Sequence, residues 1–82
     1  MNELGTGILR IMEGSSLGRM SVYILSKQTN DLGFDLNNIT TDEVSVLAIR
    51  LKTVLPFFLA DETEDIVRNI RKLATNGNTV MI

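Results

Sequence analysis

Cysteine, histidine and tryptophan are all absent from this chain of 82 residues. Without cysteine there are no disulfides, no thiolate metal sites and no cysteine nucleophile. Without histidine the chain lacks the commonest general base at neutral pH and a usual ligand of transition metals. Only carboxylate chemistry or the binding of hard cations remains. We therefore expect no enzyme, no catalytic residues, no metal site and no cofactor.

Positive charge is also scarce, because eight Lys and Arg residues face ten Asp and Glu residues. The net charge is -2 and the pI is near 4.9, so no overall field attracts nucleic acid or anionic lipid, and we expect neither as a partner. Apolar residues, in contrast, make up 44% of the chain, and its mean hydropathy is +0.15. A small domain has too little interior to hide so much apolar surface. We expect a homo-oligomer, as a dimer, or a partner protein to cover the excess.

The length suits one domain and is too short for two. Apolar residues recur at spacings of three and four, which predicts an all-α, orthogonal or bundle-like domain of four helices. The predicted elements are helices over about residues 2–13, 16–31, 41–55 with a bent continuation to 59, and 62–75, then a tail over 76–82. One short extended segment is expected near residues 34–36. The first residues do not resemble a signal peptide, so we expect a cytoplasmic protein.

Three local signals place helix boundaries. Thr40 and Glu43 form a capping-box pattern, which predicts the start of the third helix. Pro56 removes an amide donor and clashes with the preceding turn, so that helix should end or kink near Leu55. Ser16, after the break at Gly14, is a favourable N-cap for the second helix.

The segment from Gly14 to Arg19 is the most site-like stretch of the sequence. Ser15 and Ser16 would expose backbone amides at a helix start, and Arg19 could pair with a phosphate, so these three residues form a candidate anion site. The segment lacks the Lys-Ser/Thr ending of a P-loop. A cap that joins two helices is the plainer interpretation, and an uncharacterised ligand-binding domain is the alternative that this turn would support.

Two charged groups allow further alternatives. Four carboxylates lie within residues 61–65, but their spacing differs from that of an EF-hand loop, so we interpret them as charges that cap a helix. A basic face for nucleic acid, as in a small helix-turn-helix protein, is the second alternative. The residues that would form this face are Arg50, Lys52, Arg68, Arg71 and Lys72.

The run from Val54 to Ala60 carries no charge. It is too short for a membrane span, which needs about 20 apolar residues. Packing in the core is its first interpretation. The sharper hypothesis is a surface for self-association or partner docking. The residues predicted to form this interaction surface are Val46, Ile49, Phe57, Phe58 and Leu59.

The order of several segments from Arg19 onward resembles a family of short archaeal helical domains, the Nitrosopumilus-type output domain. The resembling segments are Met20–Leu25, Leu32–Ile39, the helix from Asp42 to Leu59, and Ile66–Ile70. Pro56-Phe57-Phe58 departs from the family, which tends to have a glycine-containing end to its long helix. The resemblance implies a helical domain in signal output or regulation, with no catalytic residues. We therefore expect a non-enzymatic interaction or regulatory module.

Overall fold

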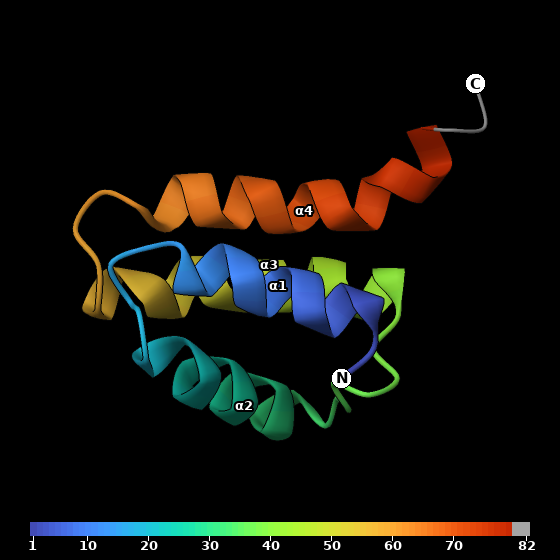
Figure 1. The fold of residues 1–82 in the computed structure, drawn as a ribbon, viewed down its shortest axis with the longest axis horizontal. Helices are drawn as coiled ribbons and strands as arrows, with labels where there is room; N and C mark the ends of the chain where they lie inside the picture. Colours follow the sequence, from blue (N-terminus) through green and yellow to red (C-terminus); the bar gives the residue numbers. More distant parts are fainter. Residues whose placement is uncertain (80–82) are drawn as a thin grey trace.

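The computed structural model describes the backbone of residues 1–79 and the side chains of residues 1–75. The described chain forms four α-helices and one short 3-10 helix, without strands. In Figure 1, α1 and α3 lie between α4 on one side and α2 on the other. The elements are α1 (Glu3–Glu13), α2 (Met20–Leu32), α3 (Thr41–Val54), η1 (Leu55–Phe57) and α4 (Thr63–Thr79). The predicted all-α, four-helix class is confirmed.

The first helix begins at a cap that also ties it to a distant part of the chain. The side chain of Asn2 accepts a hydrogen bond from the amide of Gly5 at 2.9 Å and donates one to the carbonyl of Ile39 at 2.9 Å. The amide of Asn2 donates to the carbonyl of Leu36 at 3.1 Å. These bonds hold the start of α1 against residues 34–39. The extended segment expected at 34–36 is therefore not a strand but part of a turn that contacts α1.

The second helix starts later than the sequence suggested. We expected Ser16 to be its N-cap, but α2 begins at Met20 with Arg19 at the cap position. Gly18 adopts a left-handed conformation, with φ of +51°, which a regular helix does not contain. Residues 15–19 form a series of turns instead. The helix ends at Leu32, and Gly33, which is also left-handed, is its C-cap.

The third helix has the boundaries that its local signals indicated. The Thr40 hydroxyl accepts from the Glu43 amide at 3.3 Å, and the Glu43 carboxylate accepts from the Thr40 amide at 3.1 Å, so the predicted capping box is present. Pro56 lies in η1, where α3 gives way to a tighter turn. The expected end near Leu55 is confirmed.

The fourth helix runs through the Asn76-Gly77 pair that we expected to stop it, and ends at Thr79. Neither residue excludes a helix as proline does; each only weakens it. The rest of the expected tail, residues 80–82, lies outside the described residues. Helix α4 packs mainly on α3 and also on α1.

The core lies between the four helices and consists of aliphatic side chains and Met12. Its fully buried members include Ile8, Met12, Leu25, Val44, Leu47, Leu51, Leu55 and Ile70. Val44, Leu47, Leu51 and Leu55 recur at spacings of three and four, so α3 turns one continuous stripe into the core. The opposite face of α3 is therefore the face that reaches the surface.

Candidate functional site

The outer face of α3 carries apolar side chains that the fold leaves exposed. Val46 and Ile49 are exposed, Ile49 to 61%. Thr53 follows at the same helical spacing, so these residues share one face. They line a shallow groove of about 450 Å³. The groove is lined by Leu32, Val46, Ile49, Arg50, Thr53 and Val54.

Two further exposed apolar residues, Phe57 and Phe58, follow the end of α3. The Phe57 side chain is 84% exposed and that of Phe58 is 50% exposed, which is unusual for residues of this size. Leu59 behaves differently, because its side chain is only 7% exposed and belongs to the core. The prediction that Leu59 forms part of the surface is wrong. The amide of Leu59 bonds back to the carbonyl of Leu55 at 2.9 Å, within the turn around Pro56.

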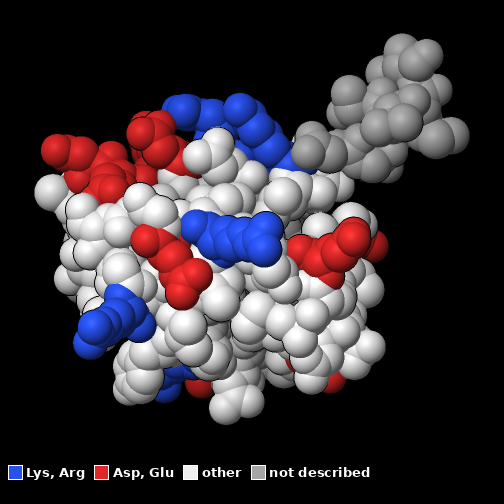
Figure 2. Space-filling view, in the orientation of Figure 1, with Lys and Arg blue, Asp and Glu red and all other residues white. Residues whose placement is uncertain are grey.

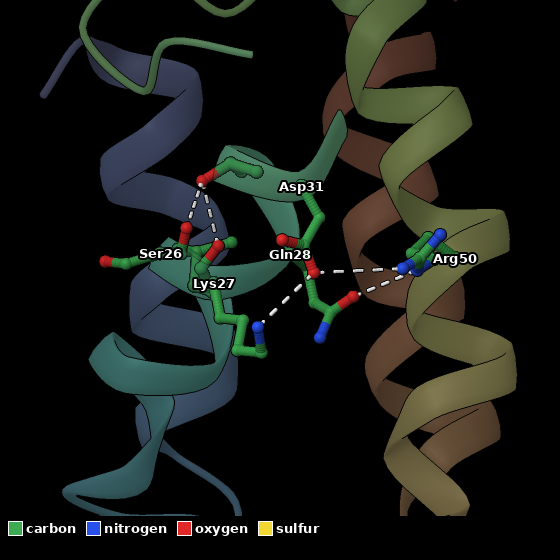
Figure 3. Close-up of polar contacts among 7 residues, drawn as sticks. Ser26, Lys27, Gln28, Asp31 and Arg50 are labelled. Atoms are coloured by element: carbon green, nitrogen blue, oxygen red, sulfur yellow. Dashed lines mark hydrogen bonds and ion pairs between the residues drawn. The ribbon is translucent and has the colours of Figure 1, made fainter. Parts of the chain in front are cut away.

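A polar cluster borders the groove where α3 meets α2 (Figure 3). Arg50 reaches from α3, and its Nε donates to Oε1 of Gln28 at 3.0 Å. A guanidinium nitrogen of Arg50 lies 3.9 Å from the carboxylate of Asp31, which also pairs with Lys27 at 3.6 Å. Gln28 is buried, so its hydrogen bond is shielded more than the two ion pairs. Arg50 therefore faces α2 and not the other basic residues.

The remaining cations of the predicted basic face gather in a second groove, between α3 and α4. Four basic residues line this groove of about 350 Å³: Lys52 from α3, and Arg68, Arg71 and Lys72 from α4. Glu64, Val67 and Thr75 complete its lining. Figure 2 shows acidic side chains over the beginning of α4 and basic side chains next to them. The sequence grouped Arg50 with these residues, and the structure separates it.

In the turn at Ser15 and Ser16, a backbone amide is hydrogen-bonded to the carboxylate of Glu62. The amide of Ser16 donates to both carboxylate oxygens of Glu62, at 3.1 and 3.3 Å. The Ser15 hydroxyl donates to the carbonyl of Met12 and accepts from the amide of Leu17 at 3.1 Å. Arg19 is exposed. The sequence predicted that amides of this turn could bind an external anion. In the structure, the Ser16 amide instead binds a carboxylate from the loop before α4.

The acidic residues around the start of α4 do not converge. Asp65 pairs with Arg68 at 3.0 Å. Glu62 points to Ser16. Within residues 1–79, no group of three or more acidic side chains is arranged to hold a metal ion. No helix in that part of the chain is long and apolar enough to cross a membrane.

Outside both grooves, hydrogen bonds lower the pKa of one carboxyl group, that of Asp35. The amide of Asn37 and the side chain of Asn38 each donate to Asp35 at 2.9 Å, and these bonds lower the pKa of Asp35 below its usual value. The group is fully exposed and orders the turn between α2 and α3. Its role there is structural.

No protein-family model, curated protein or solved structure matches this chain. The sequence indicated Ile49 from its helical position and Phe57 from the uncharged run Val54–Ala60. It gave no sign of the contacts of Arg50 with Gln28 and of Ser16 with Glu62. The latter pair is 46 residues apart, and no local pattern signals such a contact.

Proposed function

We propose that this chain is a non-enzymatic protein-interaction module that forms a homodimer through the outer face of α3. The proposal depends on one observation, the exposure of Ile49 in an apolar groove on α3 and of Phe57 shortly after the end of that helix. A phenylalanine side chain contributes roughly 150–250 Å² when it is covered. Several large apolar groups close together on a small domain are typical of an interaction site.

A second copy of the chain suits this surface because a two-fold axis lets one face serve both partners. We propose that the two α3 helices pack antiparallel. In this register Phe57 of each copy lies against Val46 of the other, and Ile49 lies against Val54. Arg50 then faces Thr53 of the other copy, while its guanidinium stays paired with Gln28 and Asp31 of its own chain. The exposed phenylalanine of one copy would thus cover the start of the apolar groove of the other.

The polar cluster at one edge of the groove supports the same proposal. Interfaces commonly have an apolar centre and a polar, partly hydrated rim. Asp31 and Arg50 are part-exposed at the α2 edge, next to the apolar residues of the groove. They would supply such a rim and limit how far the second copy extends over α2.

Light scattering coupled to size-exclusion chromatography tests the dimer directly. We expect the wild-type chain to elute with twice the mass of one 9.1 kDa chain. Ile49→Glu and Phe57→Glu should each shift the protein to the monomer, because a buried carboxylate at the contact costs several kcal/mol. Both side chains are exposed in the single chain, so the helical circular dichroism of the variants should stay unchanged.

Val22→Glu is the matched control, because Val22 is also an exposed apolar residue but does not line the groove. This variant should remain dimeric. A wild-type mass of one chain at all concentrations would refute the proposal. A dimer that survives Ile49→Glu and Phe57→Glu would place the interface elsewhere. The signal-output role that the resemblance implies, and the cytoplasmic location, stay predictions.

A further inference from the structure

The groove between α3 and α4 concentrates the positive charge of the chain. Lys52, Arg68, Arg71 and Lys72 line it, and they are half of the eight basic residues in a chain with a net charge of -2. Charges of one sign that line one groove repel one another, which disfavours the arrangement unless negative charge compensates it. A groove of this kind therefore favours an anionic ligand.

Most of these cations have no negative partner within the described part of the chain. Lys52, Arg71 and Lys72 form no ion pair there, and Arg68 pairs only with Asp65. That pair is exposed, with side-chain exposures of 61% and 73%, and exposed pairs contribute at most about 1 kcal/mol. Lys52, Arg71 and Lys72 are thus available to bind an anion, and Arg68 can leave Asp65 at a small cost in free energy.

The other lining residues limit the type of anion. Val67 lies beneath the groove and is only 5% exposed, so the hydrocarbon stems of the basic side chains supply most of the accessible apolar surface. Glu64 lies one to two helical turns before Arg68, Arg71 and Lys72 on the same helix and offers a carboxylate that can accept hydrogen bonds. The groove thus combines cations, an apolar floor and an acceptor.

The short length of the basic region argues against a long polyanion. Arg68 to Lys72 span about 6 Å of helix, and four acidic residues, Asp61, Glu62, Glu64 and Asp65, precede them. Duplex DNA carries a charge about every 1.7 Å along its axis, so a duplex that lay along α4 would extend past the cations to the acidic end of the helix. A compact anion avoids this repulsion.

We propose that the groove binds a nucleoside di- or triphosphate. Arg71 and Lys72 on α4 and Lys52 on α3 hold the phosphates. The base stacks on the guanidinium plane of Arg68 and packs on the hydrocarbon stems of the basic side chains, and the ribose hydroxyls donate to Glu64. The volume of about 350 Å³ is at the lower end of that typical for small-ligand sites. The groove shares no residue with the outer face of α3, so dimer formation does not bear on this site.

Titration of the full chain with ATP, followed by NMR of the backbone amides, tests the proposal. We expect saturable shifts at residues 52, 64, 67, 68, 71 and 72, and weaker binding of adenosine and of tripolyphosphate. Lys52→Gln and Arg71→Gln should each weaken ATP binding about tenfold, since each removes one charge-assisted hydrogen bond. Arg19→Gln removes the same charge at an exposed site outside the groove and should leave the affinity unchanged.

Other outcomes would overturn the proposal. Absence of saturable shifts with millimolar ATP would exclude the site. Equal weakening by Arg19→Gln, or equal binding of tripolyphosphate and ATP, would indicate unspecific attraction to positive charge. Salt-dependent binding of duplex DNA that displaces ATP would instead assign the groove to nucleic acid. All substituted side chains are exposed, and thermal unfolding of each variant confirms that it is folded.

Discussion

At the residue scale, two buried hydroxyls with opposite surroundings show how polar groups in this small core affect stability. Ser21 and Thr29 both lie on the buried side of α2. The Thr29 hydroxyl donates to the carbonyl of Leu25 at 2.9 Å and lies 3.1 Å from that of Ser26. The Ser21 hydroxyl is fully buried and has no hydrogen-bond partner within the described residues. An unpaired buried hydroxyl costs roughly 1–3 kcal/mol of desolvation.

We therefore predict that Ser21→Ala raises the free energy of unfolding by about 1 kcal/mol, since it removes the unpaired group and improves helix propensity. Thr29→Val keeps a similar shape but loses the hydroxyl, and should lower that free energy by about 1 kcal/mol. Urea unfolding at constant m-value measures both changes. A loss of stability in Ser21→Ala would mean that the Ser21 hydroxyl has a partner.

At the scale of the elements, glycine allows two close approaches of α1 to its neighbours. A Cβ atom added at Gly5 would lie 2.8 Å from the carbonyl oxygen of Leu36. One added at Gly7 would lie 3.0 Å from a terminal carbon of Leu73 on α4. Glycine weakens a helix by roughly 1 kcal/mol relative to alanine, so propensity alone disfavours both positions. In the structure, α1 packs so closely against its neighbours at Gly5 and Gly7 that a side chain there would displace the contacting atoms.

The two positions should respond differently to alanine. Gly5→Ala pushes against a backbone oxygen, and we expect a loss of roughly 1–2 kcal/mol even after the gain in helix propensity. Gly7→Ala pushes against the end of a flexible side chain, and the gain of about 1 kcal/mol in propensity should offset this. Chemical unfolding of both variants checks the difference. Equal effects would mean that the contact with Leu36 is not tight.

The sequence predicted those parts of the elements that depend on neighbouring residues. The start of α3 depends on Thr40 and Glu43 and its end on Pro56, and both were predictable because each signal lies within one turn. The start of α2 was not, because a serine that resembles a cap precedes Gly18, whose left-handed conformation depends on the fold. The exposed face of α3 followed from periodicity. The basic groove required the packing of α3 on α4, which no local pattern specifies.

At the scale of the whole molecule, the chain is compact and still leaves large apolar side chains exposed. The radius of gyration is 11.9 Å, close to the value of about 12 Å expected for a compact chain of this length. The chain is thus not loosely packed. Yet Ile49, Phe57 and Phe58 stay exposed, because the inner stripes of the helices already fill the core. In the dimer that we propose, a second chain covers these exposed side chains.

Dimerisation would make thermal stability depend on protein concentration, since association favours the folded state by mass action. If the dimer is the folded species, a hundredfold rise in concentration adds about 1.4 kcal/mol per chain, which raises the midpoint by several degrees. Ile49→Glu should abolish this dependence, whereas Val22→Glu should retain it. Calorimetry over two decades of concentration measures the shift. A wild-type midpoint that is independent of concentration would mean that the chain folds alone, with its apolar face left in water.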